Sequence, residues 1–294
     1  MTFSAFAAQN TFSVRSHNRR LLLLTLLDHQ PISRVRLARL TGLSTTTVTN
    51  LTGDLLTEGV IEEVGVDLEA VTQGAGRPPV ALELARDSRL AIGVHIGVRT
   101  VRVVLCNLLA AVVDGIGFAI DSNRPASEIV DQIITAVQAL ASRAGLTNQS
   151  AELVGLGVGA SGLVDCEQGI NHLAPNLGWR DVPLRDMLHR GLGLRVVVDN
   201  NVRYMALGES MYGAGQAVRT LAFVYARIGV GAGFVVDGQL YHGSAAGAGE
   251  IGHATIIPEE GEPCRCGNTG CLETLVSEPA IVRLAEELAR QDEA

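Results

Sequence analysis

Three cysteines and one histidine near the end of the chain have the types and the spacing of metal ligands. They are His253, Cys264, Cys266 and Cys271. Three thiolates and one imidazole complete the tetrahedral shell of a structural zinc ion and leave no position open for a reactive water. Gly267 and Gly270 let the backbone wrap around the ion. The alternative is a set of reduced cysteines without a ligand, but a cluster this close is rarely accidental.

Composition indicates a globular protein, because 47% of the 294 residues are hydrophobic and 33 are glycines. The apolar run 21–27 is far too short to cross a bilayer, and its flanks do not suit a secretory signal. We therefore expect a cytoplasmic protein without a membrane partner. The net charge of −8 is unevenly spread, since residues 13–59 hold six arginines and three acidic residues. A basic segment on an acidic body is typical of a DNA-binding module joined to a sensor, although chance clustering is the alternative.

Three short helices are predicted in the first sixty residues. A leucine-rich helix over 17–28 ends before Pro31, and Ser33 and Ser44 are expected to cap helices over 34–41 and 45–58. The faces that we expect to be buried contain Val35 and Ala38 in the second helix and Val48, Leu51 and Leu55 in the third. A helix, a glycine-containing turn and a helix form the helix-turn-helix motif, whose second helix enters the major groove of DNA.

Polar side chains of the third helix are the expected DNA contacts, because hydroxyl and amide groups reach both phosphates and base edges. With two arginines, the expected set is Arg34, Ser44, Thr45, Thr46, Thr47, Thr49, Asn50 and Arg77. Residues 60–61 and the alternating segment 80–84 predict a two-stranded wing with Arg77 at its tip, near the DNA backbone or minor groove. The alternative for a small three-helix unit is a dimerisation or protein-contact module.

From Leu90 onward the pattern changes to β-strands separated by helices. The expected strands cover 90–94, 101–105, 111–120, 154–159, 194–198, 220–225 and 231–237. One helix is expected over 127–144, and a second follows the run 199–201 and ends near Tyr212. This order predicts an α/β body behind the helical head.

The chain resembles the ROK family, which is named for repressors, open reading frames and kinases. Residues 37–44, 55–60 and 76–78 resemble the DNA-binding head of ROK regulators, and the runs 249–253 and 264–273 match the family signature, whose cysteines and histidine bind zinc. The resemblance implies an α/β protein with a winged helix-turn-helix over 13–85. It also implies an actin-like, sugar-kinase-type sensing domain over 88–294, with the zinc knot at 253–271.

The resemblance further implies a site for a sugar. In similar ROK proteins, the Glu and His of a Gly-Glu-x-Gly-His run and the Glu after the last cysteine bind sugar hydroxyls. Carboxylates accept from vicinal hydroxyls, and zinc ligation fixes the imidazole. The expected sugar-binding residues are Gly162, Asn200, Asn201, Glu250, His253 and Glu273. The alternative for the two glutamates is an ordinary solvated surface position.

Groups that ROK kinases use for phosphoryl transfer are missing at three places. Counted back from 206–209, the catalytic Asp of the family falls on Asn201, whose amide cannot take a proton. The first phosphate loop, 95–100, lacks the Asp and the second Gly of the kinases, and Arg227-Ile228 replaces Gly-Thr in the second loop. The chain also stops at Ala294, so the second lobe is expected to be incomplete. The alternative is that Asp199, on the same face of an extended chain as Asn201, substitutes as base.

These features predict a sugar-responsive transcriptional repressor that is not an enzyme and needs no ATP. Its expected partners are operator DNA, a small sugar or sugar-phosphate effector, and a second copy in a homodimer or dimer of dimers. One alternative is an active ATP-dependent hexose kinase with an appended DNA-binding head. Another is a fragment that dimerises poorly and acts by competition.

Overall fold

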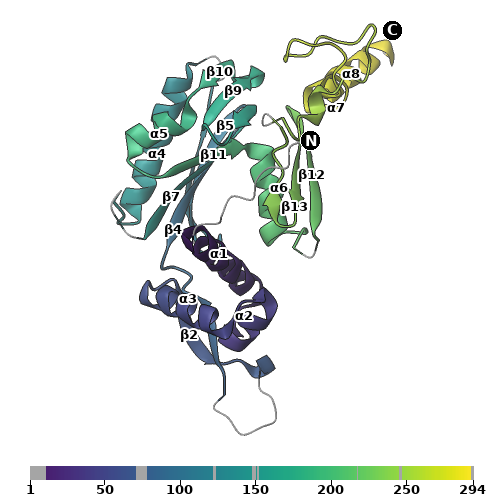
Figure 1. The fold of residues 1–294 in the computed structure, drawn as a ribbon. Coiled ribbons are helices and arrows are strands. Elements are labelled where there is room, and N and C mark those ends of the chain that lie inside the picture. The colour runs from purple at the N-terminus through teal and green to yellow at the C-terminus, as the bar shows by residue number, and fades with distance from the viewer. Residues whose placement is uncertain are drawn as a thin grey trace. The chain divides into compact units, whose positions relative to one another are not determined.

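The structure, a computed structural model, describes residues 11–70, 78–121, 124–147, 150, 152–216, 218–244 and 247–292 (Figure 1). It divides into two compact units. The first unit contains Met1–Leu90 and Cys106–Ala111, and the second contains Ala91–Leu105 and Val112–Ala294. The predicted boundary near residues 85–88 did not foresee that Cys106–Ala111 joins the first unit. Leu108 and Leu109 pack against the core of that unit, which explains the difference.

Three helices form most of the first unit: α1 (Thr11–His29), α2 (Arg34–Thr41) and α3 (Thr45–Thr57). The predicted caps explain where α2 and α3 begin. The Ser33 side chain accepts a hydrogen bond from the Arg36 amide, and the Ser44 hydroxyl accepts one from the Thr47 amide at 3.1 Å. Gly42 ends α2 with a φ of 69°, a left-handed conformation that suits glycine. The tight turn between α2 and α3 is therefore specified locally.

A small sheet completes the first unit, with its strands in the order β1-β3-β2. The strands are β1 (Ile32–Ser33), β2 (Ile61–Val66) and β3 (Val80–Leu84). The antiparallel pair β2–β3 has the strand pairing of the predicted wing. The short strand β1 was not predicted, because two residues carry no recognisable periodicity. The predicted tip of the wing, including Arg77, lies outside the described residues.

The core of the first unit is formed by leucines and isoleucines from all three helices and the sheet. Leu22, Leu26, Ile32, Leu37 and Leu55 are fully buried. The predicted stripe of α3 is confirmed, since Val48, Leu51 and Leu55 all lie in this core. The expectation for Val35 was wrong, because its side chain is 65% exposed. Leu37 fills the core beside Ala38 instead, so the buried face of α2 is rotated from the predicted one.

Asp67, which follows β2, links the wing to the start of α2. Its carboxylate accepts a hydrogen bond from the Ser33 amide at 2.8 Å and one from the Arg36 guanidinium at 3.1 Å. Burial acts to raise the pKa of Asp67, but the hydrogen bonds from Ser33 and Arg36 outweigh it and hold the pKa below its usual value.

We expect Asp67→Asn to lower the free energy of unfolding of the first unit by about 1–3 kcal/mol at neutral pH, because buried donors lose a charged acceptor. The lowered pKa means that this stability is present above the ordinary pKa of an aspartate and is lost as the pH falls through the folded-state value. Hydrogen exchange of amides in α2 measures the effect in the full chain. Glu69→Gln, at an exposed partner of the same Arg36, is the control. An equal effect of both variants at pH 7 would contradict the prediction.

A five-stranded sheet with the order β11-β7-β4-β5-β6 forms the centre of the second unit. Its strands are β4 (Leu90–Ile96), β5 (Thr100–Asn107), β6 (Val112–Ala119), β7 (Leu153–Ala160) and β11 (Val196–Asn200). The helices α4 (Ala126–Arg143) and α5 (Leu184–Leu192) pack against each other, α4 on β6 and α5 on β11. The strand β11 runs parallel to β7 and ends at Asn200, which begins the next helix.

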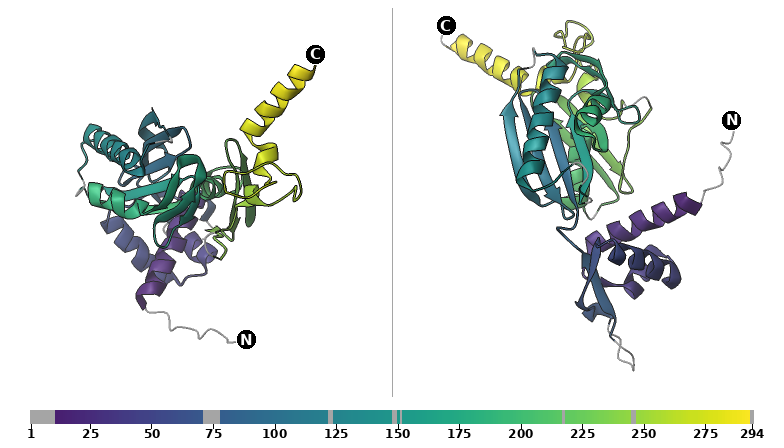
Figure 2. Two further views of the ribbon diagram at one scale, coloured as in Figure 1. Left: turned by 90° about the horizontal axis from the view of Figure 1, so that it is seen from above. Right: turned by 90° about the vertical axis from the view of Figure 1, so that its left-hand side faces the viewer.

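The helix α6 (Asn201–Tyr212) packs between this sheet and a second sheet, β12-β13-β14 (Figures 1 and 2). The strands of the second sheet are β12 (Thr220–Ala226), β13 (Val230–Val236) and β14 (Gln239–Leu240). The close approach of α6 to β13 requires Gly233, since a Cβ there would lie 2.6 Å from the Ala206 Cβ. The predicted hairpin of residues 220–237 is confirmed, because β12 and β13 pair antiparallel.

A third sheet of the second unit, β10-β9-β8, was not predicted. Its strands are β8 (Leu163–Asp165), β9 (Ile170–Ala174) and β10 (Trp179–Val182). The chain then ends in α7 (Glu273–Val276) and α8 (Glu278–Asp292). In the described part of the chain, every helix is too short or too polar to cross a membrane.

Candidate metal centre, ligand pocket and recognition helix

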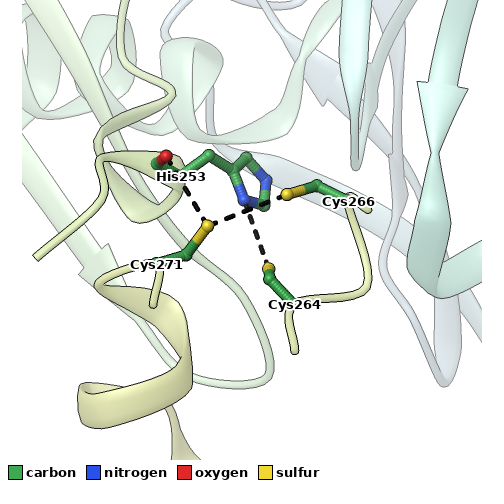
Figure 3. A group of neighbouring side chains, drawn as sticks. All are labelled: His253, Cys264, Cys266 and Cys271. Carbon is green, nitrogen blue, oxygen red and sulfur yellow. Dashed lines mark hydrogen bonds between the residues drawn. The ribbon is translucent and has the colours of Figure 1, made fainter. Parts of the chain in front are cut away.

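The four predicted metal ligands come together in the second unit (Figure 3). Their donor atoms all lie within 4.8 Å of one another. The Cys264 Sγ lies 3.7 Å from the His253 Nδ1, and the Cys266 Sγ lies 3.8 Å from the Cys271 Sγ. Neighbouring ligands of a tetrahedral zinc ion are about 3.3–3.8 Å apart, given bonds of about 2.0–2.3 Å. The spacing therefore fits one metal ion at the centre of the group.

The surroundings of the cysteines also favour a cation. Burial and the neighbouring thiols raise the pKa of Cys271 to about 12, so three adjacent thiolates would be unfavourable without a positive ion. The loop is closed by Gly270, whose φ is 66° and where a Cβ would lie 1.7 Å from the Ile257 carbonyl oxygen. The group can hold a metal ion, and the loop geometry that assembles it depends on a glycine.

A cavity of about 380 Å³ lies beside the metal ligands within the second unit. Its lining comes from the β4–β5 turn, the segment after β7, the start of α6, the β12–β13 turn and the segments on both sides of the cysteines. All six predicted sugar-binding residues line it: Gly162, Asn200, Asn201, Glu250, His253 and Glu273. Cavities of this size suit small ligands.

Asn200 and Asn201 have different roles at this cavity. The Asn200 Oδ1 accepts hydrogen bonds from the amides of Val202 and Arg203, and its Nδ2 donates to the Gly162 carbonyl at 2.8 Å. Asn200 is therefore the N-cap of α6 and has its whole amide engaged. The Asn201 Nδ2 donates to the Ser161 hydroxyl at 3.1 Å and lies 3.4 Å from the His95 Nε2. Asn201 is thus the amide that reaches across the cavity floor.

The structure does not place Asp199 where the alternative of a substitute base would require it. Its carboxylate is 3% exposed, and it accepts from the Arg203 guanidinium at 2.8 Å and lies 2.7 Å from the His242 Nε2. Asp199 also does not line the cavity. Asp199 and Asn201 do not share a face, because Asp199 belongs to the extended strand β11 whereas Asn201 is the first residue of α6. The carboxylate is a buried ion-pair partner.

The two glutamates and the histidine border the cavity near the metal ligands. The Glu273 Oε2 accepts a hydrogen bond from the Val230 amide at 2.9 Å, which fixes this carboxylate to the β12–β13 turn. Burial raises the pKa of Glu250, although interactions with His253 and Arg203 oppose the rise. The His253 Nδ1 faces the cysteines, so its Nε2 is left for a ligand in the cavity. These groups can accept from and donate to hydroxyls.

Sequence reasoning did not assign several polar residues of the cavity to the site, among them His95, Ser161 and Asn176. Asn176 lies in a short 3-10 helix, Pro175–Leu177, and its Oδ1 accepts from the Arg265 guanidinium at 2.6 Å. The Pro-Asn-Leu-Gly-Trp run that contains it is a recognisable turn sequence and was available as a signal. Ser161 directly precedes Gly162, where a Cβ would lie 2.4 Å from the Leu173 carbonyl oxygen.

The helix α3, which the sequence predicts to be a recognition helix, presents a polar face that is distinct from its buried stripe. Thr46, Thr49 and Asn50 are exposed and are spaced three and four residues apart. The expected contacts Ser44 and Thr47 hydrogen-bond each other through their side chains at 2.9 Å, because they form the helix cap. The exposed hydroxyl and amide groups that were predicted to contact DNA therefore lie in the N-terminal half of this helix.

Most of the arginines counted in the first unit form ion pairs with acidic residues, so fewer of them are available to DNA than their number suggested. Arg15 and Arg19 of α1 pair with Asp54 and Glu58 of α3, and Arg36 pairs with Asp67 and Glu69. The expected DNA contact Arg34 donates to Glu63 at 2.9 Å and to the Thr52 hydroxyl. Glu63, Asp67 and Glu69 lie outside the segment 13–59 for which charges were counted, and they form ion pairs with arginines of α2. Within the described part of this unit, Arg20 and Arg39 have no acidic partner.

The strand order, the cavity and the cysteine cluster define an α/β protein with a sugar-kinase-type fold. The chain belongs to the ROK family, whose family model matches residues 91–294.

Similar proteins include repressors and kinases. A putative xylose repressor of Caldicellulosiruptor sp. is 36% identical over 275 residues, which are 94% of this chain and 67% of the relative. A glucokinase of Halalkalibacterium halodurans is 38% identical over 199 residues, which are 68% of this chain and 60% of the relative. Among solved structures, a ROK family transcriptional regulator that is a homologue of the Escherichia coli MLC protein matches with a TM-score of 0.79 and 27% identity. That match covers 95% of this chain and 68% of the regulator.

Proposed function

We propose that this protein is a sugar-responsive transcriptional repressor that binds operator DNA through the first unit and a sugar-type effector in the cavity of the second. The observation that carries the proposal is how much of the chain each similar protein covers. The match to the xylose repressor covers 275 residues, and therefore includes most of the first unit, whereas the match to the glucokinase covers 199. The first unit with α3 is what distinguishes this chain from the kinases.

The proposed DNA contact is made by α3, with Thr46, Thr49 and Asn50 directed at base edges in the major groove. Ser44, Thr45 and Thr47 lie at the helix N-terminus, where backbone amides favour phosphate oxygens. Arg34 remains a proposed DNA contact, and Arg77, which lies outside the described residues, remains a proposed contact with the DNA backbone or minor groove. A two-fold homodimer, or a dimer of dimers, would read two half-sites of an operator. Such a repressor acts in the bacterial cytoplasm, where the DNA is.

The proposed effector site uses Glu250, Glu273 and the His253 Nε2 for sugar hydroxyls, with the Asn201 amide at the cavity floor. His253, Cys264, Cys266 and Cys271 would hold a structural zinc ion, which fixes the loop that carries these groups. Effector binding changes the affinity for DNA only if the effector prefers one of two conformations of the protein.

We further propose that the protein does not phosphorylate its sugar and needs no ATP. Asn201 occupies the sequence position of the catalytic Asp of ROK kinases, and an amide cannot take the proton of a hydroxyl. The nearest buried carboxylate, Asp199, is held by Arg203 and His242. The kinase alternative is therefore disfavoured by the side chains of the site itself.

The proposal predicts salt-sensitive binding of the full chain to a DNA fragment from upstream of its own gene, and a change in that binding with one sugar of a panel. Electrophoretic mobility shifts at several salt concentrations measure the first, and repetition with each sugar measures the second. An ATP-consumption assay with the same panel is run in parallel. Absence of DNA binding, or turnover of ATP with any of the sugars, would refute the proposed function.

A further inference from the structure

The turn between β4 and β5 places two arginines on the wall of the cavity. The Gly97 amide donates to the Thr100 carbonyl at 3.0 Å, which closes a tight turn with Arg99 at its tip. Along β5, Val101 and Val103 are buried on one face, so Arg102 between them is on the other. Arg99 and Arg102 both line the cavity, together with His95 of β4.

Neither of these two arginines forms an ion pair within the described part of the chain. Arg143, Arg219 and Arg227 of the same unit have acidic partners, whereas none of the described residues forms an ion pair with Arg99 or Arg102. Burial and the charge of Arg102 lower the pKa of His95, which locates Arg102 near that imidazole. Both guanidinium groups are therefore exposed and unpaired among the described residues, and the carboxylates of Glu250, Glu273 and Glu278 line other parts of the same cavity.

The side chain beside His95 is the neutral amide of Asn201, which would not repel an anion bound there. The Asn201 Nδ2 lies 3.4 Å from the His95 Nε2, so a carboxylate at position 201 would put negative charge beside the same wall. An amide avoids that repulsion and offers a donor. The hydroxyl-binding groups Glu250 and Glu273 line the same cavity of about 380 Å³. The cavity thus holds a cationic wall and a hydroxyl-binding wall.

We propose that Arg99 and Arg102, with His95, form a subsite for the phosphate monoester of a phosphorylated sugar effector. The inference rests on the proposed sugar-sensing function and specifies the class of effector. A planar carboxylate is satisfied by the two parallel donors of one guanidinium. Two guanidinium groups and an imidazole along one cavity offer more donors than a carboxylate needs, which suits a tetrahedral dianion with three terminal oxygens better.

The test is calorimetric binding to the full-length, zinc-loaded protein. The probes are inorganic phosphate and three pairs: glucose and glucose 6-phosphate, mannose and mannose 6-phosphate, xylose and xylose 5-phosphate. We expect one ester to bind about 10- to 100-fold more tightly than its parent sugar, as charge-assisted hydrogen bonds allow. The double variant Arg99→Gln/Arg102→Gln should reduce the affinity for that ester to the affinity for the parent and weaken inorganic phosphate. The affinity for the parent should not change.

The control is Arg195→Gln, which removes an exposed arginine that does not line the cavity. Unchanged melting temperatures of both variants exclude unfolding as the cause. The subsite alone is refuted if a neutral sugar binds and alters DNA binding but its ester gains nothing from Arg99 and Arg102. Tighter binding of glucuronate, or arginine-dependent binding of ATP, also refutes it. If DNA binding fails or no probe binds, the proposed function fails as well.

Discussion

Replacing Cys271 by serine is expected to abolish stoichiometric zinc binding and to lower the melting temperature of the second unit. Cys271 is fully buried, and its Sγ lies 3.8 Å from the Cys266 Sγ. Loss of an outer partner of a zinc ligand costs about 10–100-fold in metal affinity, so loss of a ligand itself should exceed that range. Because metal binding and folding are coupled, the loop between His253 and Cys271 should lose protection with the metal.

The measurements are zinc content by elemental analysis, thermal unfolding, and hydrogen exchange of the amides between His253 and Cys271. Cys106→Ser, at a cysteine outside the cluster, is the matched control and should retain one zinc per chain. Chelation of zinc from the unchanged protein should reproduce the effect of Cys271→Ser on protection. Full protection of this loop in metal-free protein would show that the cluster is not a structural zinc site.

Replacing Asn50 and Thr46 together by alanine is expected to remove most sequence-specific DNA binding. A bidentate contact between a side chain and a base is worth about 1–3 kcal/mol, so Asn50→Ala alone should weaken operator binding about 10- to 100-fold. The double variant should approach non-specific affinity while its salt dependence stays nearly constant, because neither residue is charged. Both side chains are exposed, so the fold of the first unit should be retained.

The matched control is Thr57→Ala, at the opposite end of α3, where the hydroxyl donates only to the Gly53 carbonyl. It should bind operator like the unchanged protein. Arg20→Ala, at an arginine without an acidic partner among the described residues, should instead weaken all DNA sequences and reduce the salt slope by about one. If the Asn50 and Thr46 variants bind operator normally, α3 is not the recognition helix.

The ion pairs of the first unit affect how such experiments are interpreted. A hydrogen bond from Arg19 lowers the pKa of Glu58, and burial opposes this shift only in part. The pair is therefore charged at neutral pH. Arg15 and Arg19 neutralise the acidic end of α3 and are not free to bind phosphates. The head is therefore expected to depend on base readout more than on net positive charge.

Local sequence predicted much of this molecule, and the reason is that the signals act over a few residues. The caps Ser33 and Ser44, the glycine turn between them and the stripe of Val48, Leu51 and Leu55 are all short-range features. The hairpin of β12 and β13 was equally recognisable. The sheet β10-β9-β8 was missed because its short strands pair with one another and show no clear alternation.

Residue types and spacing alone determined that His253, Cys264, Cys266 and Cys271 form one group, because zinc ligands are few and lie close in this chain. Only the tertiary structure decided how carboxylates and arginines are used. It places Asp199 in a buried ion pair, and among the described residues it gives Arg99 and Arg102, which line a cavity, no acidic ion-pair partner. The physical reason is that the state of a charge depends on its neighbours in space, and those neighbours are distant in sequence.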